Sequence, residues 1–164
     1  YGMGLTLATA SSAASFTIAT KDSFGQTSTR GGDAFSVSAD RPGSASLQFF
    51  SYCSPSLSCV QSSAGSGSIT DRNTGTYAVS YTPTVSGRYS VDVKLGKISK
   101  IQSSPFDLIV KAGTLCATKS RAYGAGLTIA TTGMQGRFTL VAKDEYSNDV
   151  DYLDDSTLSC ARGG

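Results

Sequence analysis

Large apolar residues alternate one by one with mostly smaller residues in three stretches of the chain between residues 76 and 110. The apolar positions are Tyr77, Val79 and Tyr81, then Tyr89, Val91 and Val93, and finally Phe106, Leu108 and Val110. A period of two is typical of β-strands that place one face on a core and the other in water. Glycine and proline separate the stretches, as they do at turns. The pattern therefore predicts three consecutive antiparallel strands.

The first part of the chain is repeated near its end. Residues 1–26 align without gaps to residues 123–148, and eleven of the 26 positions are identical. Both copies begin Tyr-Gly-x-Gly-Leu-Thr, and both contain a Lys-Asp pair, Lys21-Asp22 in the first and Lys143-Asp144 in the second. Self-similarity at a fixed shift indicates an array of one structural unit. We expect the first copy to lack the strand that residues 113–121 supply to the second, and the second copy to stop partway through its unit.

The motifs of both copies resemble a filamin-type immunoglobulin-like repeat, the filamin/ABP280 repeat family. The second half of such a repeat is matched by Gly-Thr-Tyr at residues 75–77, by Gly-x-Tyr at residues 87–89 and by Ser-Pro-Phe at residues 104–106. The first half is matched by the opening Gly-x-Gly-Leu and by Gly-Gly-Asp at residues 31–33. The resemblance implies an all-β fold, an immunoglobulin-like antiparallel β-sandwich, in tandem repeats of which one is nearly complete and one is truncated.

This resemblance divides the chain into two domains. Residues 1–111 are expected to form a filamin-type repeat that lacks its first strand and carries a long insert at residues 41–67. Residues 112–164 are expected to form the N-terminal half of a second repeat.

The cysteines number four, and they are Cys53, Cys59, Cys116 and Cys160. Their spacing does not match a zinc site, and without histidine such a site would need all four thiolates together. Disulfides are the more economical interpretation, and they indicate an oxidising compartment. Cys53 and Cys59 are expected to close a small loop. The topology implied by the resemblance brings Cys160 to Cys116, which makes this a divergent, disulfide-containing form of the repeat.

The composition argues against catalysis, nucleic-acid binding and membrane insertion. The absence of histidine removes the commonest general base, and no motif indicates a catalytic residue or a cofactor. A formal net charge of +2 is too small to indicate nucleic acid, and no apolar run approaches the roughly 20 residues of a membrane helix. We therefore expect no enzyme, no cofactor, no nucleic-acid partner and no direct membrane insertion in this segment.

A weak calcium candidate lies in the acidic segment of the second copy, at Asp149, Asp151, Asp154 and Asp155. Calcium takes six to eight oxygen ligands, but the spacing does not match an EF-hand loop. A solvated acidic loop is the favoured interpretation, so no metal site is predicted.

These observations favour a non-catalytic structural or adhesive module of an extracellular or cell-surface repeat array. It would be a rigid spacer or filament component whose partners are neighbouring repeats and other proteins, with homotypic assembly as a further option. The alternative is a cytoplasmic filamin-like scaffold, for which the resemblance implies partner peptides that bind by β-strand addition.

Overall fold

The computed structural model describes residues 1–41, 65–96 and 98–151, and it divides the chain into two compact units, Tyr1–Lys111 and Ala112–Gly164. Each unit is described here by itself. The regular structure is β-strand, with two short 3-10 helices, η1 (Met3–Leu5) and η2 (Ala125–Leu127).

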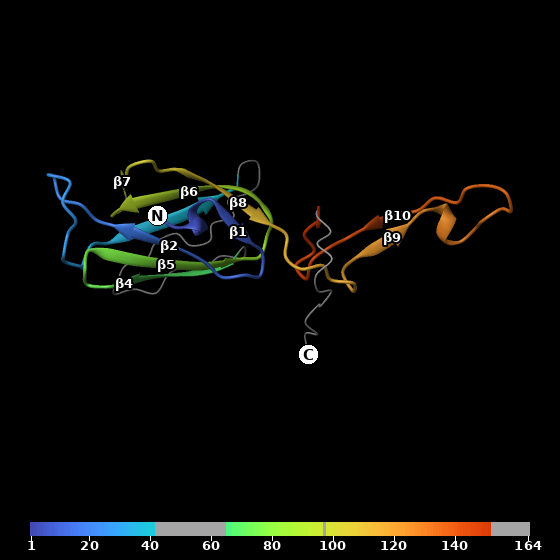
Figure 1. The fold of residues 1–164 in the computed structure, drawn as a ribbon, viewed down its shortest axis with the longest axis horizontal. Helices are drawn as coiled ribbons and strands as arrows, with labels where there is room; N and C mark the ends of the chain where they lie inside the picture. Colours follow the sequence, from blue (N-terminus) through green and yellow to red (C-terminus); the bar gives the residue numbers. More distant parts are fainter. Residues whose placement is uncertain (42–64, 97, 152–164) are drawn as a thin grey trace. The chain divides into compact units, whose positions relative to one another are not determined.

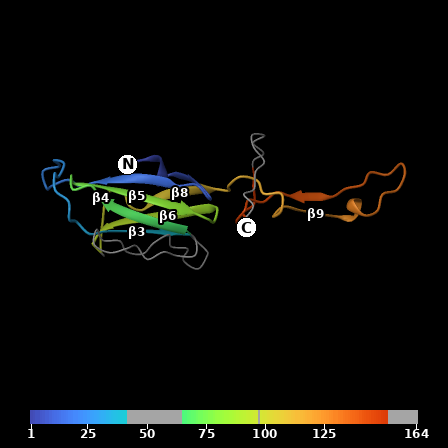
Figure 2. The same ribbon diagram turned by 90° about the horizontal axis from the view of Figure 1, so that it is seen from below.

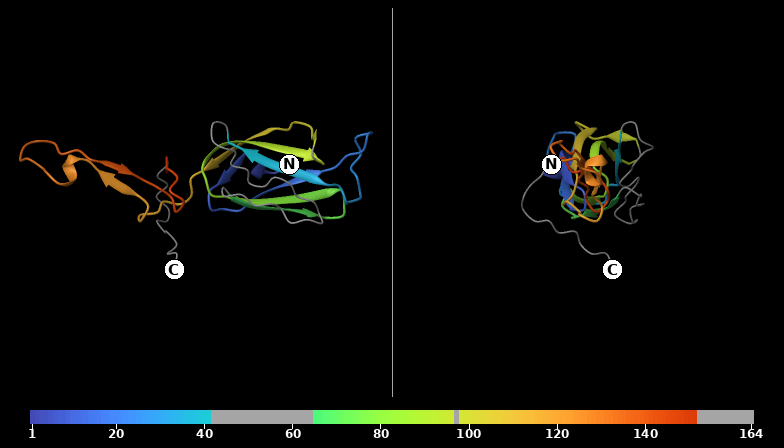
Figure 3. Two further views of the ribbon diagram at one scale, coloured as in Figure 1. Left: turned by 180° about the vertical axis from the view of Figure 1, so that it is seen from behind. Right: turned by 90° about the vertical axis from the view of Figure 1, so that its right-hand side faces the viewer.

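The first unit is a sandwich of two sheets (Figures 1 and 2). The larger sheet has the order β1 (Leu7–Thr9), β8 (Phe106–Lys111), β6 (Gly87–Leu95) and β3 (Phe35–Asp40), and β7 (Ser99–Lys100) also pairs with β6. The smaller sheet has the order β2 (Ala14–Ala19), β5 (Thr76–Pro83) and β4 (Gly65–Asp71). All pairs are antiparallel except β1 with β8. The view from behind in Figure 3 shows the same two layers, which confirms the immunoglobulin-like sandwich.

The three predicted strands are present as β5, β6 and β8, but they do not form one meander. β6 and β8 are antiparallel neighbours, whereas β5 belongs to the other sheet. The chain therefore crosses between the sheets in the turn after Pro83. An alternating pattern reports which face of a strand is buried and carries no information about its partner, so the pattern alone does not show that the three predicted strands are divided between two sheets.

The structure describes the last residues of the predicted insert. Gly65, Ser66 and Gly67 lie in β4, where they pair with Pro83, Thr82 and Tyr81 of β5. Residues 42–64 lie outside the described part, so the remainder of the insert stays a prediction.

The core of the first unit lies between the two sheets. Its buried side chains alternate along each strand, as the period of two predicts. The most enclosed are Tyr77 and Val79 from β5, Tyr89 and Val93 from β6, and Leu108 from β8, all 0% exposed. Such burial of large side chains supplies most of the stabilisation, at about 25 cal/mol per Å² of apolar surface removed from water.

Each core tyrosine that the alternation places inward finds a partner for its hydroxyl group. Tyr89 donates to the carbonyl oxygen of Val85 at 2.8 Å. Tyr81 donates to the carbonyl oxygen of Gly4, and burial raises the pKa of Tyr81. Tyrosine is therefore tolerated in this core because its polar end is satisfied.

A charged group on β6 is held by its neighbours. Asp92 accepts a hydrogen bond from Lys100 at 2.9 Å and one from the Ser104 hydroxyl group at 3.1 Å. Burial by itself raises the pKa of Asp92. The two hydrogen bonds and the positive charges of Lys100 and Lys94 lower this pKa by more than burial raises it, so the net pKa of Asp92 is lowered.

The second unit repeats the local structure of the first. β9 (Arg121–Tyr123) pairs antiparallel with β10 (Thr139–Val141), as Figure 1 shows. Gly124 has a φ of 131° and precedes η2, as Gly2 with a φ of 128° precedes η1. Such φ values favour glycine, which explains why the repeated motif opens with this residue. The two copies recognised in the sequence thus share the backbone conformation of this opening motif.

Candidate functional site

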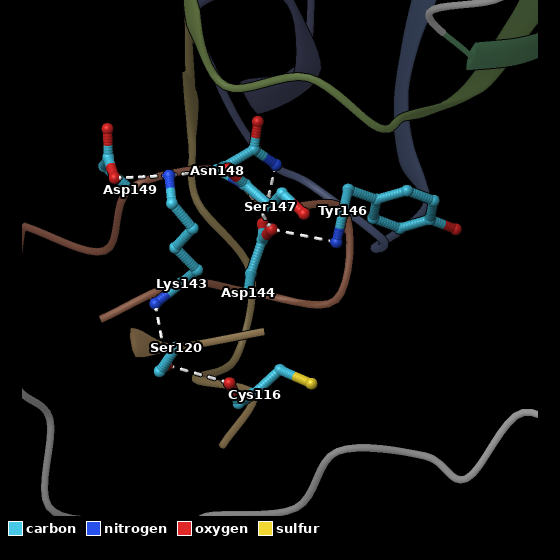
Figure 4. Close-up of polar contacts among 8 residues, drawn as sticks. All are labelled: Cys116, Ser120, Lys143, Asp144, Tyr146, Ser147, Asn148 and Asp149. Atoms are coloured by element: carbon cyan, nitrogen blue, oxygen red, sulfur yellow. Dashed lines mark hydrogen bonds and ion pairs between the residues drawn. The ribbon is translucent and has the colours of Figure 1, made fainter. Parts of the chain in front are cut away.

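Within the described residues of the second unit, the carboxylate of Asp144 accepts four hydrogen bonds, and it lies at the start of a tight turn formed by residues 144–148. We call this the Asp144 turn. The Asp144 side chain is buried, at 1% exposure, and its Oδ1 accepts hydrogen bonds from the backbone N–H groups of Tyr146 at 3.0 Å and Asn148 at 2.8 Å (Figure 4). The Asp144 N–H donates to the carbonyl oxygen of Asn148 at 3.0 Å. Aspartate favours such turns because its short side chain reaches backbone donors two residues on.

The second carboxylate oxygen ties this turn to the beginning of the unit. Oδ2 of Asp144 accepts from the backbone N–H of Gly113 at 2.8 Å and from the side-chain amide of Asn148 at 2.7 Å. We call residues 113–123 the entry segment, because they lead into β9. One carboxylate therefore joins two parts of the chain 31 residues apart.

Two further hydrogen bonds join the entry segment to Lys143, the residue before Asp144. The N–H of Cys116 donates to the carbonyl oxygen of Lys143 at 2.7 Å, and the N–H of Lys143 donates to the hydroxyl group of Ser120 at 3.0 Å. Ser120 in turn donates to the carbonyl oxygen of Cys116 at 2.8 Å (Figure 4). The entry segment is thus fixed at Gly113, Cys116 and Ser120.

The acidic residues singled out from the sequence lie next to this cluster. Asp149 forms an ion pair with Lys143 at 2.7 Å, and Asp151 is exposed. Asp154 and Asp155 lie outside the described residues. In the part of the chain that the structure describes, no three metal-ligating side chains gather. The ion pair occupies one oxygen of Asp149, so the calcium candidate gains no support from these contacts.

Of the four cysteines, the structure describes Cys116. Its side chain is 0% exposed. Its Sγ lies 3.2 Å from the hydroxyl oxygen of Thr118. Cys53, Cys59 and Cys160 lie outside the described residues, so both pairings stay predictions.

Sequence reasoning overlooked Asp144 in favour of the acidic residues that follow it. The available signal was the Lys-Asp pair, which recurs at Lys21-Asp22 in the first copy. Every hydrogen bond described for the carboxylate of Asp144 comes from the chain itself, so its chemistry is that of an anchor for the polypeptide. Among the described helices, none is long and apolar enough to cross a membrane.

Comparisons with known proteins agree with this fold. The chain is 30% identical over 136 residues to the E3 ubiquitin-protein ligase TRIM71 of Rattus norvegicus, a match that covers 82% of this chain and 13% of that protein. The solved structure of FdeC, an Escherichia coli adhesin, is similar with a TM-score of 0.58 and 19% identity, over 90% of this chain and 40% of that one. Invasin, a bacterial integrin-binding protein, is similar with a TM-score of 0.57 and 19% identity, over 87% of this chain and 25% of that one.

The chain thus spans a small part of the curated relative, and the structural matches show a shared fold. A family model decides the assignment, because the filamin/ABP280 repeat model matches residues 1–107, which confirms the resemblance seen in the motifs. The chain belongs to the filamin/ABP280 repeat family.

Proposed function

We propose that this chain is a non-catalytic structural module of an extracellular or cell-surface repeat array, in which each unit acts as a spacer or filament component. Its partners are neighbouring repeats of the same chain and other proteins, including further copies of itself. The observation that carries the proposal is the anchoring of the entry segment at the start of the second unit.

This anchoring shortens the connection between consecutive units to one residue. β8 ends at Lys111, and Gly113 already donates to the buried carboxylate of Asp144, so only Ala112 lies between them. A short connection restricts how far two repeats can separate along the chain. Tension would pass from the hydrogen bonds of β8 directly to those of the entry segment.

A disulfide at Cys116, as the sequence predicts, would support the extracellular part of the proposal. Disulfides persist in secreted and surface proteins and are rare in the reducing cytosol. A bridge from the entry segment to the later acidic segment would hold the same region that Asp144 holds by hydrogen bonds. In the chain-entropy model, a Cys116–Cys160 bridge would add about 4 kcal/mol of stability.

Peptide mapping of native material without reduction tests this proposal. We expect peptides linked through Cys53–Cys59 and Cys116–Cys160. Recovery of all four cysteines as free thiols would contradict the extracellular assignment and would favour the cytoplasmic scaffold.

Surface labelling gives an independent test on intact cells. An amine reagent that does not cross membranes should label Lys100, whose side chain is 48% exposed. Labelling that appears only after the cells are permeabilised would contradict the proposal. A cytoplasmic intermediate filament protein labelled in the same samples is the control for membrane integrity.

A further inference from the structure

The outward face of the larger sheet carries a short row of side chains on β8. Asp107, Ile109 and Lys111 alternate with the buried Leu108 and Val110, so they point away from the core on one side of the strand. All three are exposed, and Ile109 is 47% exposed. Along the strand the row is negative, apolar and positive, with about 7 Å between neighbours. We call Asp107, Ile109 and Lys111 the β8 row.

The neighbouring strands extend the apolar centre of this row. Leu7 of β1 and Arg88 of β6 are the register partners of Ile109 on its two sides (Figure 1). Leu7 is 37% exposed, so two aliphatic side chains lie next to each other on the surface. The other described outward positions of β1, β8, β6 and β3 are polar, and they are Thr9, Asp107, Lys111, Arg88, Ser90, Asp92, Lys94, Ser36, Ser38 and Asp40. The apolar surface of this face is therefore confined to the middle of the β8 row.

Charged side chains distinguish this face from the outward face of the smaller sheet. The described outward positions of β2, β4 and β5 hold serine, threonine and alanine, and none of them is charged. On the larger sheet, the carboxylate of Asp92 is already held by Lys94 and Lys100. Asp107 takes part in none of the ion pairs that the structure describes. Its exposed carboxylate is therefore available to a partner outside the unit.

The β8 row is complementary to itself when one copy is reversed. A second copy can lie over the first with its β8 antiparallel, related by a two-fold axis through Ile109. Asp107 of each copy then meets Lys111 of the other, and the Ile109 and Leu7 side chains meet their own counterparts between these charges. The two Arg88 side chains are long enough to turn away from each other into water at the rim. A two-fold interface uses the same patch on both partners, and complementary charges fix its register.

The spacing of packed sheets suits these contacts. Two sheets stack face to face about 10 Å apart, with their strand directions within about 30° of each other. An aspartate and an extended lysine together bridge this gap, while Ile109 and Leu7 fill its centre. The patch is small, so one contact between two units is weak. Many such contacts act together when the units are joined in an array.

We propose that the β8 row, with Leu7 beside it, is the surface through which two copies of this chain associate face to face and antiparallel. β8 lies between β1 and β6, so its backbone groups are already paired and only its side chains are offered to a partner. This excludes a partner strand added to β8, and the mixed charges of the row favour a second copy over a partner of one sign. The inference rests on the self-association named in the proposed function and assigns a surface to it.

Charge reversal in the full chain tests this register. Asp107→Lys makes both ends of the row positive, and Lys111→Asp makes both ends negative. We expect the dissociation constant of each variant alone to rise at least tenfold over that of the parent chain, in sedimentation experiments at about 0.1–1 mM protein, the range for weak contacts. An equimolar mixture of the two variants should associate as the parent does, because their rows are opposite in charge. The double variant Asp107→Lys/Lys111→Asp should associate as well, because its row again has opposite ends.

Matched controls separate this contact from a general effect of net charge. Asp151→Lys and Lys119→Asp make the same changes of charge at exposed positions of the second unit, and they should leave the association unchanged. Ile109→Thr keeps a β-branched residue on the strand, so the circular dichroism should stay that of the parent chain while the dissociation constant rises at least tenfold. Raising the salt from about 0.1 to 1 M shortens the screening length from about 10 to 3 Å and should weaken the parent and the mixture alike.

Three results would overturn the proposal. They are a parent chain that stays monomeric at about 1 mM, single variants that associate as strongly as the parent, and a mixture or double variant that fails to regain association. None of these results depends on how the cysteines pair. The failure of this proposal is therefore distinguishable from failure of the extracellular assignment, which peptide mapping tests.

Discussion

Replacing Asp144 by alanine should release the entry segment from the second unit. The carboxylate is 1% exposed and accepts bonds from three backbone N–H groups, those of Gly113, Tyr146 and Asn148. Gly113 is itself buried, so its N–H would lose its partner without access to water. Tyr146 and Asn148 lie on a more exposed turn, where water can replace part of the loss.

The magnitude follows from this difference in exposure. A buried donor left without a partner costs about 1–3 kcal/mol, and a hydrogen bond to a charged group contributes about 1.5–3 kcal/mol. We assign about 2 kcal/mol to the lost hydrogen bond of the Gly113 N–H and about 1 kcal/mol to those of the two turn amides together. The free energy of unfolding of the second unit should therefore fall by about 3 kcal/mol. The matched control is Asp22→Ala, where the turn is exposed and only Phe24 and Gln26 lose an acceptor. This control should cost about 1 kcal/mol.

Hydrogen exchange at the single N–H of Gly113 measures the effect directly. Since about 1.4 kcal/mol corresponds to a factor of ten, the Gly113 amide should exchange about 100-fold faster in Asp144→Ala. The variant Asp144→Asn should lose protection at Gly113 and retain most of it at Tyr146 and Asn148. Unchanged protection of Gly113 in the alanine variant would show that the carboxylate does not anchor the entry segment.

Two further predictions concern the first unit. A Cβ atom at Gly4 would lie 2.5 Å from the carbonyl oxygen of Ser15, so Gly4→Ala should destabilise by more than about 2 kcal/mol in urea unfolding. Gly136→Ala in the second unit, whose Cβ would meet nothing closer than 3.7 Å, is the control for an added methyl group and should change stability by less than about 0.5 kcal/mol. The pKa of Asp92 is lowered in the folded chain, so its contribution to stability is present above the ordinary carboxyl pKa and is lost as the pH falls through the lowered value. Asp92→Asn should therefore flatten the loss of stability on acidification below about pH 4, and an unchanged pH profile would contradict the role of Lys100.

The sequence was sufficient to predict the strands of the core but not how they pair. Tyr77, Val79 and Tyr89 alternate with smaller residues, and all three are buried as the period of two requires. β4 was missed because its sequence is rich in glycine and serine, and its strand conformation depends on pairing with β5. Pairing of this kind is a contact between distant residues, which a local pattern does not report.

The anchoring site was missed for a similar reason. The acidic residues after Asn148 attract attention by their charge, whereas Asp144 owes its role to the N–H of Gly113, 31 residues away. The internal repeat offered the one usable clue, because Lys-Asp is conserved between the two copies at Asp22 and Asp144. Similarity between copies locates such a residue, and only the structure shows which atoms it binds.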